Sequence, residues 1–119
     1  MMVEELGYPK ALLSVEKGLD SMPHLPPGNY PTRRFDLVCF CKGVISDHPL
    51  YPLLVIECKS VPLKPEFRKQ VIGYNYYLGA PFVALVNDEV IEFAARGHYE
   101  FRSGLPKYED LISCLQSTV

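Results

Sequence analysis

The stretch from Leu53 to Ser60 constrains this chain most, because an apolar run ends there in two opposite charges. It reads Leu-Leu-Val-Ile-Glu-Cys-Lys-Ser, which predicts a buried strand that carries Glu57 and Lys59 at its end. Side chains on a strand alternate between faces, so Glu57 and Lys59 share one face and Cys58 takes the other. Burial of two charges is costly unless they are paired, hydrogen-bonded or bound to a metal. The strand therefore ends either in a salt bridge or in a functional site.

Length and composition fit one globular domain spanning residues 1–119. The chain is 48% hydrophobic and 22% charged, so it can bury a core. A net charge of −2 excludes a strongly basic protein that coats nucleic acid, so any phosphate contact has to be local. No apolar run approaches the roughly 20 residues that span a bilayer, and residues 1–13 lack the apolar core of a signal peptide. We therefore expect a cytoplasmic protein without a membrane partner.

The cysteines and histidines show no metal-binding spacing. Cys39 and Cys41 form a C-x-C on a predicted strand, so both face one way, and no second pair follows as in a zinc site. We expect all four cysteines to be reduced and mostly buried in the core. The three histidines lie in or near predicted loops and read as surface residues: His24, His48 and His98.

Turn residues and apolar periodicity predict a mixed α/β order. We expect strands over residues 14–19, 32–42, 53–60, 81–86 and 89–95, and helices over 3–6, 66–78 and 109–116. Residues 20–31 and 43–52 read as turns, and 97–105 as a loop or edge. The helix over 66–78 should cross over to a parallel strand, whereas the earlier strands pair antiparallel. The predicted fold class is α/β, a mixed sheet flanked by helices.

Polar residues on neighbouring elements should meet at the end of the Leu53–Ser60 strand. Asp36 lies near the start of the preceding strand, and in an antiparallel hairpin the start of one strand adjoins the end of the next. Two facing carboxylates repel, and a hard divalent cation relieves that repulsion. A nearby lysine can stabilise charge on a phosphate in the transition state. Asp36, Glu57 and Lys59 therefore predict a site for metal-assisted phosphodiester hydrolysis, with Gln70 on the following helix within reach.

These residues resemble a known group of nucleases. Asp36 followed by Glu57-Cys58-Lys59 resembles the D…E-x-K signature of the PD-(D/E)xK superfamily, and residues 70–74 resemble its Q-x-x-x-Y helix motif. The chain is more specifically similar, over roughly residues 5–110, to the N-terminal nuclease domain of type I restriction enzyme R subunits in a short stand-alone form. The matching segments are Glu5–Lys10, Ser14–Lys17, Arg33–Val38, Leu54–Lys59, Gln70–Tyr74 and Ala80–Phe82.

The resemblance implies a restriction-endonuclease-like fold and a DNA nuclease that depends on Mg²⁺ or Mn²⁺. It implies that Asp36, Glu57 and the main-chain carbonyl of Cys58 hold the metal. DNA is the implied partner, within a larger restriction or repair assembly, and a homodimer is compatible with the sequence.

The resemblance also implies the remaining roles. Lys59 would act on the attacking water or on the scissile phosphate, and Gln70 would orient Lys59 or the water. A further acid would complete the site, for which Glu16 is preferred slightly over Glu5.

Each of these residues also has a structural interpretation. Glu57 and Lys59 could form only a salt bridge, and Asp36 could pair with Arg33 or Arg34. Gln70 and Glu16 could be ordinary solvated residues. The tyrosines of the central helix are expected to pack rather than to stack on bases, and basic residues could form a positive rim or plain surface: Tyr74, Tyr76 and Tyr77, and Lys10, Lys17, Lys64, Arg68 and Lys69.

A second function uses the same fold without cleavage. The short segment before Glu5 and the lack of an ATP-driven translocase in this sequence motivate it. In this alternative the chain is a catalytically silent DNA-binding or protein-assembly module.

Overall fold

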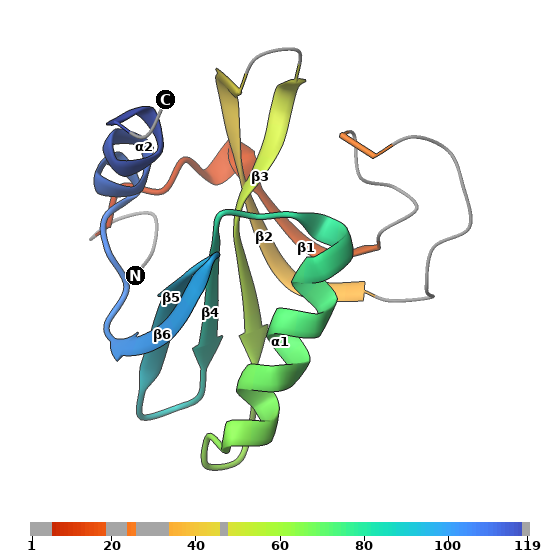
Figure 1. The fold of residues 1–119 in the computed structure, drawn as a ribbon, viewed down its shortest axis with the longest axis vertical. Helices are drawn as coiled ribbons and strands as arrows, with labels where there is room; N and C mark the ends of the chain where they lie inside the picture. Colours follow the sequence, from red (N-terminus) through yellow and green to blue (C-terminus); the bar gives the residue numbers. More distant parts are fainter. Residues whose placement is uncertain (1–5, 19–23, 26–33, 46–47, 118–119) are drawn as a thin grey trace.

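Six strands pair in one sheet in the order in which they occur in the sequence (Figure 1). The computed structural model describes residues 6–18, 24–25, 34–45 and 48–117. Its elements are η1 (Lys10–Leu12), β1 (Leu13–Gly18), β2 (Arg34–Ile45), β3 (His48–Cys58), α1 (Pro65–Leu78), β4 (Phe82–Val86), β5 (Ile91–Ala95), β6 (His98–Ser103) and α2 (Tyr108–Ser117).

Helix α1 connects the two strands of the sheet that run parallel. Strands β3 and β4 run parallel, because α1 carries the chain from the end of β3 back to the start of β4. All other neighbouring strands are antiparallel. The predicted fold class, a mixed α/β sheet flanked by helices, is confirmed.

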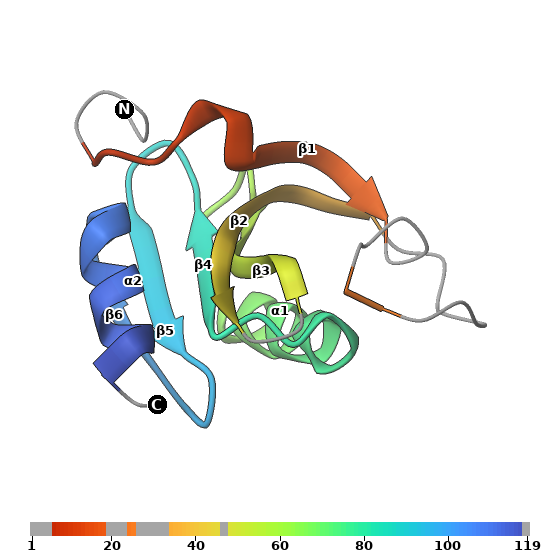
Figure 2. The same ribbon diagram turned by 90° about the horizontal axis from the view of Figure 1, so that it is seen from above.

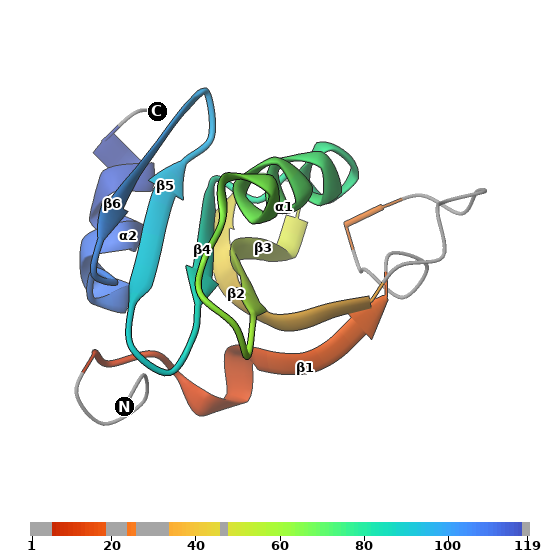
Figure 3. The same ribbon diagram turned by 90° about the horizontal axis from the view of Figure 1, so that it is seen from below.

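The two α-helices cover opposite faces of the sheet, with β4 and β5 between them (Figures 2 and 3). On the α1 side, Val38 and Val55 pack with Val71 of the helix. On the α2 side, Cys39 and Ile56 pack in the cluster that contains Leu111. Strands β2 and β3 therefore supply both cores, which explains their near-continuous apolar sequence.

Helix α1 follows its predicted pattern. Pro65 occupies the first turn, where a missing N–H costs nothing. Gly79 ends the helix in the left-handed conformation, with φ of 75°. Phe67, Val71, Tyr74 and Leu78 recur at helical spacing, which predicts one apolar stripe along the helix. Val71 and Leu78 are buried, and the other two members of the stripe pack against the same core.

Asn75 ties the end of α1 to the next strand. It is buried, donates through Nδ2 to the Ala80 carbonyl at 2.7 Å and to the Tyr99 hydroxyl at 3.0 Å, and accepts from the Ala80 N–H at 2.8 Å. Because both ends of the amide are used, Asn75 fixes the turn that starts β4.

The predicted turn over residues 43–52 is wrong for most of its length. Strand β2 continues to Ile45 and β3 begins at His48, and only residues 46–47 lie outside the described chain. Pro52 pairs with Phe40 next to a register shift. A proline is tolerated at such an irregularity because it has no ladder hydrogen bond to donate there.

Residues 97–105, read as a loop or edge, contain the edge strand β6, so the edge alternative is confirmed. Most of the helix predicted over residues 3–6 lies outside the described residues. None of the described helices is long and apolar enough to cross a bilayer.

The thiols and one histidine also depart from expectation. All four cysteines are thiols and none forms a disulfide, but only Cys39 and Cys41 are buried, whereas Cys58 and Cys114 are exposed. His24 is not a plain surface residue. Its Nε2 lies 2.6 Å from the Leu78 carbonyl, at the end of α1. The side chains of His48 and His98 lie outside the described part.

The tyrosines of α1 divide into two groups. Tyr74 packs against the α1-side core as predicted. Tyr76 is 82% exposed and Tyr77 44% exposed, so the packing prediction is wrong for these two, which fall off the apolar stripe. Their rings contact each other edge to face.

Candidate active site

The predicted site lies where β3 ends, at the lower edge of the sheet in Figure 1, near the loop that leads into α1. Asp36 Oδ2 accepts a hydrogen bond from the main-chain N–H of Cys58 at 2.8 Å. The start of β2 and the end of β3 therefore meet as the hairpin geometry predicts. The alternative pairing of Asp36 with Arg33 or Arg34 involves side chains that lie outside the described part of the chain.

Strand register places Asp36 and Glu57 side by side. Val38 pairs with Val55 in the α1-side core, and Leu37 pairs with Ile56. One step further along both strands, Asp36 stands opposite Glu57. Because alternate residues share a face, both carboxylates lie on the face that α1 covers.

Glu57 is the one acidic side chain among the described residues that is buried, at 6% exposure. Burying a carboxylate is unfavourable unless positive charge or hydrogen bonds compensate it. An acid buried at the end of an otherwise apolar strand is therefore a feature expected of a site, since core packing alone would favour an apolar residue.

Lys59 turns toward α1. Its Nζ lies 3.5 Å from Gln70 Oε1 and 4.7 Å from the centre of the Phe67 ring. Among the described side chains, Lys59 forms no ion pair, so it does not make the salt bridge with Glu57 that was the structural alternative. Gln70 is exposed to solvent, yet it lies beside Lys59.

Strand β1 brings one of the two candidate acids into line. Val15 pairs with Leu37 and Lys17 with Phe35, so Glu16 occupies the position opposite Asp36. Positions 16, 36 and 57 thus form a row across β1, β2 and β3. The side chain of Glu16 and the whole of Glu5 lie outside the described residues.

Cys58 is exposed at the end of β3. The expectation that its thiol packs in the core is therefore wrong. Partial burial raises the pKa of this thiol, and the negative charges of Asp36 and Glu57 raise it further. The charges of both carboxylates therefore affect the same thiol.

A second loop supports the segment that follows β3. The Lys59 N–H donates to the Val86 carbonyl at 2.8 Å, and Asn87 Nδ2 donates to the Val61 carbonyl at 3.1 Å. Asn87 Oδ1 in turn accepts from the N–H groups of Glu89 and Val90 at 2.9 and 2.8 Å. Asn87 therefore fixes the β4–β5 turn and joins it to the loop after Lys59.

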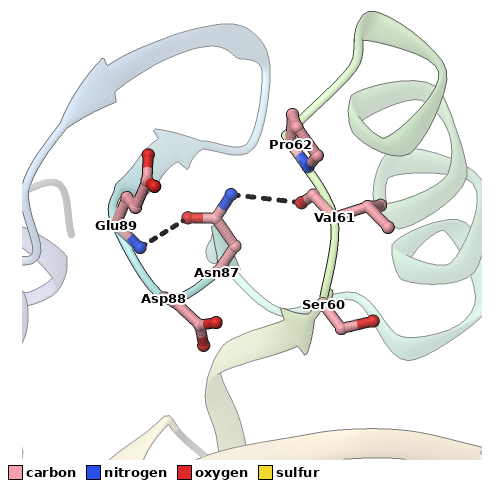
Figure 4. A pocket seen from close by; sticks show the side chains of 6 residues that line it. All are labelled: Ser60, Val61, Pro62, Asn87, Asp88 and Glu89. Carbon is pink, nitrogen blue, oxygen red and sulfur yellow. Dashed lines mark hydrogen bonds between the residues drawn. The ribbon is translucent and has the colours of Figure 1, made fainter.

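These two loops line a small open pocket of about 110 Å³ (Figure 4). It is lined by Ser60, Val61, Pro62, Asn87, Asp88 and Glu89. The sequence indicated only a turn at Asn87. An asparagine that opens a turn is typical of this local capping, which is the signal that could have identified it.

Arg68 does not belong to a free positive rim. Its guanidinium binds the Glu92 carboxylate through two hydrogen bonds of 2.8 Å and lies 5.5 Å from the centre of the Phe101 ring. The Arg68 hydrogen bonds hold the pKa of Glu92 below its ordinary value of 4.5. Lys10, Lys64 and Lys69 are exposed, whereas the side chain of Lys17 is outside the described residues.

The donor set is sparse and made of oxygen atoms. Within the described side chains, no group of three or more His, Cys, Asp and Glu residues could hold a metal ion. Asp36 and Glu57 provide two carboxylates, and main-chain carbonyls provide the other oxygen atoms that could bind a metal. This composition suits a cation such as Mg²⁺, which uses one or two carboxylates and keeps several waters.

A family model described as the type I restriction enzyme R protein N terminus matches residues 1–106. The chain belongs to this family. The match spans most of the 119 residues and includes every candidate site residue of this type I restriction enzyme domain. No curated protein and no solved structure matches the chain.

Proposed function

We propose that this restriction enzyme domain is a metal-dependent nuclease that hydrolyses phosphodiester bonds of DNA. The observation that carries the proposal is the meeting of Asp36, Glu57 and Lys59 at the end of β3. The Cys58 N–H holds Asp36 there, and Gln70 of α1 lies beside the Lys59 ammonium. Family membership supports the same reading.

The proposed ligands for Mg²⁺ or Mn²⁺ are Asp36, Glu57 and the main-chain carbonyl of Cys58, with Glu16 as a fourth. The N–H and C=O of a strand residue point to the same side, so the Cys58 carbonyl is expected on the side of Asp36, where its N–H donates. All of these groups offer oxygen atoms, which fits a hard divalent cation.

The chain's own groups divide the work. When bound, the cation would polarise a phosphate oxygen and make a bound water more acidic. The Lys59 ammonium stabilises negative charge on the phosphate in the transition state, or orients the water. Gln70 accepts a hydrogen bond from the ammonium and limits its rotation.

DNA contact and assembly follow from the same proposal. A net charge of −2 restricts phosphate contacts to local positive groups. The exposed Lys64 and Lys69, at the start of α1, lie near Lys59 in the sequence and can supply such contacts. The family to which the chain belongs suggests that other restriction subunits are its partners.

A cleavage assay with a metal titration tests the proposal. Supercoiled, linear, branched and single-stranded DNA would be incubated with increasing Mg²⁺ or Mn²⁺. Wild type should cleave at least one form, and Lys59→Ala should cleave about 100-fold more slowly or worse. Lys107→Ala, an exposed lysine before α2, is the matched control and should retain the wild-type rate.

The same assay identifies the alternative. A wild-type chain that binds DNA, or a restriction subunit, but cleaves no form with either metal is a silent binding or assembly module. The nuclease proposal is then withdrawn.

A further inference from the structure

We propose that Phe67 is a positioning residue for Lys59, whose ammonium is held against the face of the Phe67 ring beside Gln70. The inference rests on the proposed nuclease function for the role of Lys59. It adds a residue that the sequence pattern assigned only to the apolar stripe of α1.

Two groups from one helix approach the ammonium. Lys59 Nζ lies 4.7 Å from the Phe67 ring centre and 3.5 Å from Gln70 Oε1. Phe67 and Gln70 are three residues apart on α1, so they are neighbours on the helix surface. The lysine end is thus held between a ring and an amide that move together.

The amide alone is a weak restraint. A distance of 3.5 Å is at the outer limit of a hydrogen bond, whereas 4.7 Å lies well within the range of a cation–π contact. Phe67 is also half-buried and packs against the α1-side core, so its ring cannot follow the lysine into solvent. The ring is therefore the more rigid of the two partners.

The Phe67 ring can hold the Lys59 ammonium without neutralising its charge, which suits a lysine that has to bind a phosphate. A carboxylate at this place would hold the ammonium but neutralise its charge. An aromatic face attracts the cation through its quadrupole and leaves the full positive charge available. Among the described side chains, no carboxylate pairs with Lys59, which matches this arrangement.

A simpler reading is that the aliphatic stem of Lys59 covers the ring through apolar packing alone. Stepwise fluorination of Phe67 separates the two readings, because fluorine weakens the quadrupole while nearly preserving the shape of the ring. Fluorinated phenylalanines would be placed at position 67 of the full chain and, as a control, at Phe93, which stacks on Phe82 on the opposite face.

The expected result is a stepwise fall in kcat with each added fluorine at position 67, reaching about 2- to 5-fold, with KM nearly constant. The Phe93 series should remain flat. In a Lys59→Ala background the Phe67 series should also be flat, since the cation is gone. A fall of equal size in that background, or an equal fall in the Phe93 series, overturns the proposal.

A second measurement does not depend on cleavage. In wild type, the ε-methylene protons of Lys59 should show nuclear Overhauser contacts with the Phe67 ring and an upfield ring-current shift. Phe67→Leu should abolish both, and Phe67→Tyr should restore them. Lack of the contacts in wild type overturns the placement whatever the activity. Contacts in a chain that cleaves no DNA support the placement and overturn the nuclease function instead.

Discussion

The carboxylate of Asp36 accepts a hydrogen bond from the main-chain N–H of Cys58, 22 residues further along the chain, at 2.8 Å. This contact closes the end of the β2–β3 ladder beyond the last regular pair, Leu37 with Ile56. It also fixes Asp36 beside Glu57. One carboxylate therefore serves the sheet and the proposed site together.

Substitutions of Asp36 separate these two tasks. Asp36→Asn keeps an oxygen that can accept from Cys58, so stability should stay within about 1 kcal/mol, whereas cleavage should fall about 100-fold because one metal ligand loses its charge. Asp36→Ala should lose about 1 kcal/mol more, since the Cys58 N–H loses its partner. Urea unfolding and cleavage rates measure both effects. Near-normal cleavage by Asp36→Asn would exclude this residue as a ligand.

Glu16 is expected to complete the metal site, because its position lies opposite Asp36 in the β1–β2 register. Glu16→Gln should raise the Mg²⁺ concentration for half-maximal cleavage by about 10-fold, as loss of a metal-site partner commonly does. Glu100→Gln is a suitable control, because Glu100 is exposed on the edge strand β6. An unchanged Mg²⁺ dependence in Glu16→Gln would remove Glu16 from the site and return attention to Glu5.

Cys58 is expected to contribute only its main chain. Its thiol is exposed, and strand alternation turns it away from Glu57 and Lys59. Cys58→Ala should therefore retain cleavage within about threefold of wild type, well inside the loss expected for Lys59→Ala. Rates of the two variants, compared at equal folded concentration, provide the measurement. A Cys58→Ala variant that folds but no longer cleaves would give the thiol a role of its own.

Asn87 should matter for the loop that carries Lys59. Asn87→Asp keeps the acceptor for the Glu89 and Val90 N–H groups but places an oxygen against the Val61 carbonyl. We expect a loss of about 1–2 kcal/mol in stability, together with slower cleavage, because the segment after β3 loses a tether. Asp88→Asn, the exposed neighbour in the same turn, is the control. Equal behaviour of both variants would show that the tether is unimportant.

The Arg68–Glu92 pair predicts a pH-dependent contribution to stability. The pKa of Glu92 is lowered in the folded chain, so the pair stabilises at neutral pH and loses this effect as pH falls below 4.5 and through the lowered value. Glu92→Gln should be about 0.5–1 kcal/mol less stable than wild type at pH 7, since the pair is partly exposed. Unfolding from pH 7 to pH 2 should show the difference disappear. A difference that stays constant with pH would contradict the assignment.

Local patterns predicted the frame of the site well. A few neighbouring residues are enough to predict each of three features from the sequence: the apolar run before Glu57, the apolar stripe of α1 and the glycine that ends this helix. Hairpin geometry then predicted that Asp36 meets the end of β3, because it requires only strand order. The charge of Glu57 after a buried run was itself the signal.

The remaining contacts depend on tertiary packing, which no local pattern specifies. His24 contacts the end of α1 from 54 residues away, and Arg68 of α1 binds Glu92 of strand β5. Pro52 reads as a turn residue until its partner Phe40 and the neighbouring register shift are known. Phe67 reads as core because the sequence cannot show which face of its ring meets a lysine.

The sheet order from β1 to β6 has a consequence for how the protein folds. Each strand pairs with the strand next to it in the chain. Four of the five pairings are antiparallel and need no helix between their strands. The parallel β3–β4 pairing alone requires a helix, α1, to form between its strands. Contacts with small sequence separation form quickly because they close short loops. The acids on β1, β2 and β3 can therefore align early, whereas Lys59 receives its partners only when α1 docks. Cleavage competence should accordingly be among the last properties to appear on refolding.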